Sequence, residues 1–214
     1  FGGGGAGGDD DNGGDAHGGD GLYGGGGGGA SSSSANRKGG DGGDGAVLFR
    51  YTLAAGSITV NAGDDVRVGG KLTGESVTVK TGNADTSTDD SYIADAIDVA
   101  DGGGGFTKQG SGTLKLTADN TFTADTNIEA GTLQIGDGGA NGSLSSGTIK
   151  VDDSATLAIN RTSHLDLSSV IEDADLDGDS NIGGSVVVDA AGANITLSGA
   201  NTYSAGTTLK AGRL

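Results

Sequence analysis

The 214-residue chain contains no cysteine, proline, methionine or tryptophan. Without cysteine it has neither a disulfide framework nor a cysteine-ligated zinc or iron–sulfur site. The absence of proline and of a strict Gly-X-Y period excludes a collagen helix. The stability of the fold must therefore come from side-chain packing and from backbone hydrogen bonds.

Basic and aromatic residues are also scarce. Twelve Lys and Arg residues oppose 29 Asp and Glu residues, which gives a formal net charge of −17. This charge repels nucleic acid and anionic lipid, so we expect neither as a partner. No apolar run approaches the roughly 20 residues that span a bilayer, and the N-terminal residues do not resemble a signal peptide. We therefore expect no membrane span in this segment, and we interpret the chain as part of a longer or processed protein.

Glycine is abundant, with 47 residues in total and 22 of them within residues 1–45. This segment offers little apolar surface to offset the entropy lost on ordering. Two interpretations stay open: a flexible, solvated tail, or extended polyglycine strands that pack against another surface. We treat residues 1–45 as a Gly/Asp-rich, low-complexity segment and residues 46–214 as the folded domain.

From residue 46 onward, short runs of Thr, Val, Ile and Leu alternate at period two between Gly, Asp and Asn. Runs such as 113–117, 132–135 and 156–159 have the length and the alternation of half-buried β-strands. The nearest candidate for a helix, residues 92–99, also alternates, and we expect a strand or loop there. The pattern predicts an all-β fold.

One segment of the chain occurs twice. Residues 114–133 align without a gap with residues 195–214, which lie 81 positions later, and eight of the 20 positions are identical. Self-similarity at a fixed period is typical of stacked structural units. Because the second copy stops at Leu214, we interpret the array of repeats as truncated there.

The residues from 104 to 136 (GGFTKQGSGTLKLTADNTFTADTNIEAGTLQIG) resemble the passenger-associated transport repeat of autotransporters. The main departures from the family pattern are Phe106 for the usual Leu, Ala118 and Asp119 around the first turn, and Asp125 where Gly is common. This resemblance implies a right-handed parallel β-helix, or solenoid, in the passenger of a type V secreted protein. An antiparallel β-sandwich is the alternative all-β fold.

A β-helix would satisfy its strand edges by pairing each turn with the next, about 4.8 Å further along the axis. Period-two spacing would then point the following side chains inward: Leu114, Leu116, Ile128, Leu133 and Ile135. Asn120 and the pair Ala130-Gly131 suit corners, where a side-chain cap or left-handed backbone is needed. We also expect Phe122 and Tyr203 to occupy equivalent corners.

The chain offers few candidates for catalysis. Only His17 and His164 could titrate near neutral pH without a perturbed pKa, and His17 lies in the glycine-rich segment. Ser163, His164 and Asp166 are close in sequence, but a catalytic triad is a spatial arrangement that also needs an oxyanion site. Glycan-cleaving enzymes use a pair of carboxylates, but such pairs are so common in this acidic chain that they do not indicate an active site. We predict that the chain is not an enzyme, with a polysaccharide-active β-helix enzyme as an alternative.

Residues 173–184 (DADLDGDSNIGG) begin like a calcium-binding loop, with oxygen ligands at alternate positions and glycine at the tight turn. Gly184 stands where a bidentate Glu should close such a loop. We therefore predict a weak calcium site, with a solvated acidic insertion as the alternative; its ligands would be Asp173, Asp175, Asp177 and Asn181. We expect no other cofactor. A single glycine-rich nonapeptide at residues 39–47 cannot build a calcium-binding β-roll, which needs tandem repeats.

These features predict a structural or adhesive segment of an autotransporter-like protein, located outside a Gram-negative cell or on its outer membrane. Exposed ladders of Thr, Asn and Asp would present a polar face to cell-surface glycans or to other cells. The alternative is a self-assembling subunit of an extracellular filament or surface layer. In that case, the open end at Leu214 would be capped by another copy of the chain.

Overall fold

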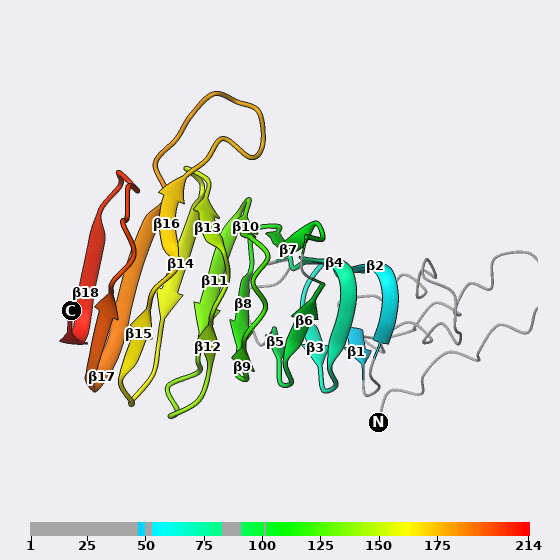
Figure 1. Ribbon diagram of the computed structural model, residues 1–214, viewed down its shortest axis with the longest axis horizontal. Helices are drawn as coiled ribbons and strands as arrows, with labels where there is room; N and C mark the ends of the chain where they lie inside the picture. Colours follow the sequence, from blue (N-terminus) through cyan, green and yellow to red (C-terminus); the bar gives the residue numbers. More distant parts are fainter. Residues whose placement is uncertain (1–46, 50–52, 83–90, 101) are drawn as a thin grey trace, which may run out of the picture.

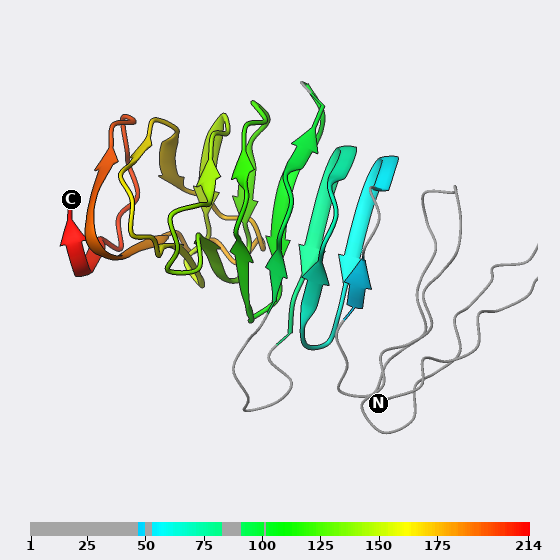
Figure 2. The same cartoon turned by 90° about the horizontal axis from the view of Figure 1, so that it is seen from below.

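The computed structural model describes residues 47–49, 53–82, 91–100 and 102–214, and within these ranges the side chains from residue 56 onward. The described residues form strands, turns and loops, with no helix. The strands stack along the long axis of the molecule (Figures 1 and 2). All of the strand pairs found among them are parallel, which confirms the β-solenoid and shows that the antiparallel sandwich is wrong.

Two expectations concern parts of the chain outside this description. Residues 1–45, including His17, are not among the described residues, and neither is the nonapeptide at 39–47 apart from its last residue. Among the residues that are described, no helix is long and apolar enough to cross a membrane.

One face of the solenoid, which we call the first sheet, takes a strand from each successive turn. Leu114 lies opposite Leu133, and Leu133 lies opposite Leu157, so equivalent residues of neighbouring turns are in register. The strands of this face follow one another in the order β1 (Val47–Phe49), β3 (Val66–Val68), β5 (Tyr92–Ile93), β8 (Thr113–Leu116), β11 (Gly131–Ile135), β14 (Ala155–Ile159), β17 (Ser185–Leu197) and β18 (Thr207–Arg213).

Two other faces complete each turn. The second sheet contains β2 (Leu53–Asn61), β4 (Leu72–Lys80), β7 (Gly105–Gln109), β10 (Thr126–Ile128), β13 (Thr148–Val151) and β16 (Val170–Asp173). Between the two sheets the chain forms short strands, namely β6 (Ile97–Val99), β9 (Asp119–Asn120), β12 (Ser143–Leu144) and β15 (Leu165–Leu167). We call these four strands the short-strand face. The stretch 92–99 thus forms β5 and β6, as expected from its alternation.

The core fills the space enclosed by these faces. Strands such as β14 alternate buried and half-buried residues, because successive side chains point to opposite sides of a strand. All of the residues that were expected to point inward are at most 1% exposed: Leu114, Leu116, Ile128, Leu133 and Ile135. Apolar burial is thus continuous along the axis, and each turn covers the apolar edge of its neighbour.

The two copies of the repeat start on different faces of the solenoid. Leu114 belongs to the first sheet, whereas Ile195 lies in the last part of β17 and pairs with Leu165 of β15. The strand β17 is long enough to bend from one face to the next, because its first part pairs with β14. The offset of 81 residues is therefore three turns plus one face rather than a whole number of turns.

This shift makes one expectation wrong, because Phe122 and Tyr203 do not occupy equivalent corners. Phe122 lies between β9 and β10 and packs at a ring-centroid distance of 6.4 Å from Phe106. Tyr203 instead precedes β18 of the first sheet, and its hydroxyl lies 2.5 Å from that of Thr207. An ungapped alignment reveals the repeat, but it does not reveal how many residues each turn uses.

Asn120 links three successive turns through its side chain. Its Oδ1 accepts a hydrogen bond from the backbone N–H of Ile97 in the preceding turn at 2.8 Å. Its Nδ2 donates to the carbonyl oxygen of Ala118 at 2.9 Å and to that of Ser143 in the following turn at 3.1 Å. The side chain is 1% exposed, and the N–H of Ile97 that it satisfies is buried as well. The predicted corner role of Asn120 is confirmed as a side-chain cap.

The Ala130-Gly131 corner depends on left-handed backbone. Gly131 has a φ of +68°, and a Cβ atom at this position would lie 2.5 Å from the carbonyl oxygens of Gly110 and Gly112. Gly212 holds the same place in the second copy and has a φ of +93°. Both glycines thus adopt the left-handed backbone that the repeat pattern predicts after the alanine.

Lys108 occupies an inward position of β7 and is fully buried. Its Nζ donates to the carbonyl oxygens of Gln109, Gly110 and Ala130 at 2.8, 2.7 and 3.1 Å. Burying an ammonium group is costly unless such partners replace its water. Lys108 therefore ties one turn to the corner of the next.

Asp125, which departs from the family pattern, also joins two turns. Its Oδ1 accepts from the N–H of Thr148 at 2.9 Å, and its Oδ2 lies 2.9 Å from Nζ of Lys150. The hydrogen bond from Thr148 and the neighbouring Lys150 lower the pKa of Asp125 below its ordinary value. A carboxylate thus replaces the usual glycine and contributes contacts to the following turn.

The Asn120 cap can be tested with the Asn120→Ala substitution. Because this variant leaves the buried N–H of Ile97 without its partner and removes two further bonds to part-buried carbonyl groups, we expect the free energy of unfolding to fall by about 2 kcal/mol. The matched control is Asn201→Ala, which removes bonds to Ile171 and Leu197 from a half-buried side chain and should cost about 1 kcal/mol. Urea denaturation of both variants provides the comparison, and equal losses would contradict a special role for Asn120.

Candidate functional site

The three residues that resemble a catalytic triad in sequence bind different partners in the structure. Ser163 Oγ donates to the carbonyl oxygen of Ala140 at 2.7 Å. His164 Nδ1 lies 2.8 Å from the carbonyl oxygen of Asn194, and Asp166 Oδ1 accepts from Ser198 at 2.6 Å. Each side chain thus connects one turn to another, and the three do not hydrogen-bond in series as a triad requires.

The acidic insertion 173–184 joins β16 to β17 and projects beyond the ends of the strands (Figure 1). Most of its carboxylates cap backbone N–H groups of the same loop. Asp175, for example, accepts from the N–H groups of Gly178 at 2.7 Å and Ser180 at 3.1 Å. The loop is therefore a series of side-chain-capped turns, as short polar residues favour.

The predicted calcium ligands separate into two groups. Asp175 and Asp177 lie together in the loop, in a cluster of three exposed carboxylates with Asp179. Asp173 lies apart, because its Oδ1 accepts from the N–H groups of Gly184 at 2.7 Å and Ser204 at 3.1 Å. Asn181 donates from Nδ2 to Asp179 at 2.7 Å. The structure thus brings Asp175 and Asp177 together and leaves Asp173 outside their cluster.

A second carboxylate cluster joins this loop to the preceding turn. Asp152 and Asp153, which follow β13, approach Asp177, with one oxygen of each residue within 4.8 Å of the others. Burial acts to raise the pKa of Asp152, but hydrogen bonds, above all from the N–H of Leu176, lower it below its ordinary value. The pKa of Asp153 is raised because its carboxyl group hydrogen-bonds with that of Asp152.

Sequence analysis missed Asp152, Asp153 and Asp179 as members of these clusters. Asp179 lies inside the predicted loop, but at the position where the calcium-loop pattern uses a backbone carbonyl rather than a side chain as ligand. The other two could have been found only from the register of β13 with β16, which sets Val151 opposite Asp173. That register depends on the number of residues in one turn, which cannot be read from the sequence.

The first sheet has a different electrostatic character. Its strands β3, β5, β8, β11 and β14 contain no Asp or Glu, although the chain has 29 such residues. On their outer side, four half-buried polar residues of successive strands are in register: Arg67, Tyr92, Lys115 and Gln134. We call these four residues the first-sheet row. Sequence analysis did not identify it, because its members are 19 to 25 residues apart and meet only through strand register.

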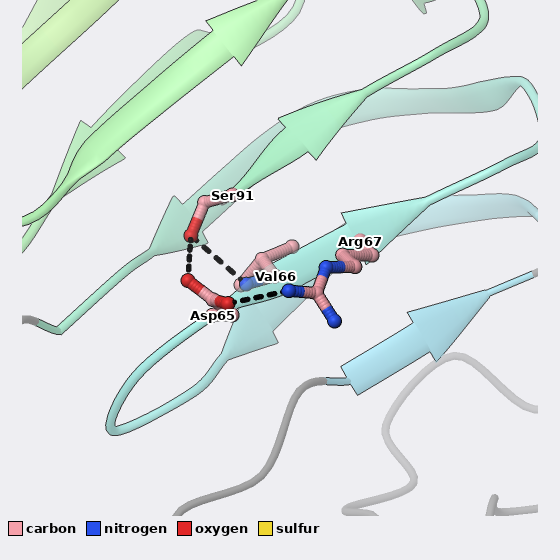
Figure 3. Close-up of polar contacts among 4 residues, drawn as sticks. All are labelled: Asp65, Val66, Arg67 and Ser91. Atoms are coloured by element: carbon pink, nitrogen blue, oxygen red, sulfur yellow. Dashed lines mark hydrogen bonds and ion pairs between the residues drawn. The ribbon is translucent and has the colours of Figure 1, made fainter. Parts of the chain in front are cut away.

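One end of the first-sheet row is held by a small polar network (Figure 3). Nη2 of Arg67 lies 2.8 Å from Oδ2 of Asp65. The hydroxyl of Ser91 accepts from the N–H of Val66 at 3.0 Å and donates to Oδ1 of Asp65 at 3.4 Å. Because Ser91 is fully buried and precedes β5, this network fixes the start of β3 against the next turn.

Comparison with known proteins gives two matches to this solenoid. The passenger-associated transport repeat family matches residues 106–135 and 194–214. The adhesin BmaC autotransporter of Brucella suis biovar 1 (strain 1330) is 33% identical over 132 residues, which make up 62% of this chain. No solved structure matches the chain significantly.

The fold and the repeats define the chain as a parallel β-solenoid built with passenger-associated transport repeats. Together with the relative, they support an autotransporter passenger with passenger-associated transport repeats, which is what the sequence resemblance implied. The matched residues span only 3% of the length of that adhesin.

Calcium binding by the acidic insertion stays a prediction, and the structure suggests how to test it. Carboxylate oxygens are the ligands that calcium prefers, and Asp177 belongs to both clusters. We expect millimolar calcium to raise the melting temperature of the chain, and Asp177→Asn to reduce this increase. Asp119→Asn, which changes an exposed carboxylate of β9, is the control. If calcium leaves the melting temperature unchanged, the prediction is wrong.

Proposed function

We propose that the chain is a non-enzymatic, adhesive segment of an autotransporter passenger exposed outside a Gram-negative cell. The observation that carries the proposal is the similarity, over 132 residues, to a protein that is itself named an adhesin. A surface or extracellular location agrees with the passenger repeats, which are features of a secreted domain.

The architecture supports this proposal physically. A parallel solenoid repeats its outer positions about every 4.8 Å, so that it presents long rows of similar side chains at fixed spacing. One such row is the hydroxyl series Thr113, Thr132, Thr156 and Ser185. Rows of this kind offer many weak, equivalent contacts, and several contacts made together raise the overall affinity for an extended surface.

Adhesion can be tested with the 214-residue chain itself. We expect the fluorescently labelled chain to bind cultured mammalian cells saturably and to be displaced by an excess of unlabelled chain. An equally acidic, folded protein of similar size serves as the control for charge. Binding no greater than that of this control would contradict the adhesive role.

The non-enzymatic part of the proposal has its own measurement. Incubation with a panel of polysaccharides, followed by a reducing-end assay, should release no new ends. Release above the level of a heat-denatured sample would favour the alternative of a polysaccharide-active enzyme.

Self-assembly into a filament is a second candidate, and the edge of β18 is the place to test it. Leu209 and Leu214 are 48% and 55% exposed, whereas their counterparts in the first copy, Ile128 and Leu133, are fully buried. The outer edge of β18 therefore presents apolar side chains and strand backbone, which a further turn of a longer chain or the strand of another copy could cover. If the chain self-associates, its sedimentation coefficient should rise with protein concentration. The Leu209→Lys substitution should suppress this rise. A constant monomer value would contradict it.

A further inference from the structure

Charge is distributed unequally over the faces of the solenoid. The short-strand face carries exposed Asp98, Asp119 and Asp166, and the second sheet carries Glu75 and Glu172. The first-sheet strands from β3 to β14 carry no acid. A chain with a net charge of −17 repels polyanions in general, so a negatively charged ligand meets less repulsion over these strands than over the faces whose strands carry acids.

The first-sheet row supplies attractive groups on this face. Arg67 and Lys115 lie on the two sides of Tyr92, one strand away from it in each direction. With about 4.8 Å between strands, the two cationic residues are anchored about 10 Å apart, with an aromatic ring between them. Gln134 extends the row by one more strand.

The backbone that carries these groups is ordered before any ligand arrives. The buried residues Val66, Ile93 and Leu114 hold the three strands against the core. The ion pair between Asp65 and Arg67 orients the guanidinium group at one end of the row (Figure 3). Preorganisation of this kind reduces the entropy lost on binding.

The chemistry of the row indicates the class of ligand. Charged groups on an aromatic background suit a sugar polymer, whose rings have apolar faces and whose acidic substituents recur at intervals. A protein partner would require an apolar centre, and the only exposed large hydrophobic side chains among the described residues are Ile182, Leu209 and Leu214, none of which lies in the row.

We propose that the first-sheet row binds an anionic polysaccharide that runs along the solenoid axis. Arg67 and Lys115 contact its sulfate or carboxylate groups, Tyr92 packs against a sugar ring, and Gln134 hydrogen-bonds to hydroxyl groups. The proposal rests on the adhesive function above and specifies the ligand of that function. Asp65 limits the affinity, because its carboxylate shares the guanidinium of Arg67.

The test measures binding of the 214-residue chain to heparin, which is sulfated, and to polygalacturonate, which carries carboxylates. Uncharged dextran is the negative control polymer. We expect Arg67→Gln and Lys115→Gln each to weaken binding of the preferred polymer by at least fivefold. Each should also make the affinity less dependent on salt, because one fewer cation then contacts the polymer. The preferred polymer distinguishes sulfate from carboxylate as the recognised group.

Two further variants separate the row from general charge effects. Lys71→Gln removes a cation of similar exposure that pairs with Asp98 of the short-strand face, and it should change the affinity by less than twofold. Asp65→Asn should strengthen binding, because it removes the competing carboxylate. Thermal melting of every variant verifies that the solenoid is folded.

The row proposal is overturned if Lys71→Gln weakens binding as much as Lys115→Gln, or if the wild-type chain binds neither polymer. Testing the same variants in the cell-binding assay distinguishes failure of the row proposal from failure of the adhesive function. Adhesion that persists in Arg67→Gln and Lys115→Gln would place the contact on another face. Absence of adhesion by the wild-type chain would instead contradict the proposed function itself.

Discussion

Parallel pairing between successive turns is the constraint on which the rest of this structure depends. A turn on its own would leave its strand edges unpaired and its apolar side chains half covered, and both deficits are met only by the turns on either side. Asn120, Lys108 and Asp125 reinforce this pairing at the corners, because each of them bonds to backbone of another turn. The fold therefore needs neither a disulfide nor a helix to hold its layers together.

The same constraint determines where function can be located. Inward positions are committed to the core, so only outer rows and the loops between strands can vary freely. The acidic insertion uses one such loop, and it gathers carboxylates from two turns beside β16. The first-sheet strands from β3 to β14 instead contain no acid and present Arg67, Tyr92 and Lys115 in register. If the first-sheet row binds a polyanion as proposed, an acidic protein reserves one face for a ligand that the rest of its surface repels.

The fold was largely predictable from sequence, because period-two alternation and the repeat both report on burial and on corners. Leu114, Leu133 and the Ala130-Gly131 corner follow directly from that pattern. What could not be predicted is the number of residues in each turn, which depends on loops of irregular length. This single unknown explains why Phe122 and Tyr203 were assigned to equivalent corners. It also explains why Asp152, Asp153 and the first-sheet row were missed, since these groups form only across turns.

The most direct test of inter-turn register uses engineered disulfides, which the absence of native cysteine makes simple to interpret. Thr132 lies opposite Thr113 in one neighbouring turn and opposite Thr156 in the other. Cysteines at 113 and 132 would have Cα atoms about 5 Å apart, within the range of a disulfide, whereas 113 and 156 would be about 10 Å apart. The register predicts rapid crosslinking of the first pair under mild oxidation and none of the second. Crosslinking of the second pair in preference to the first would contradict the stacked solenoid.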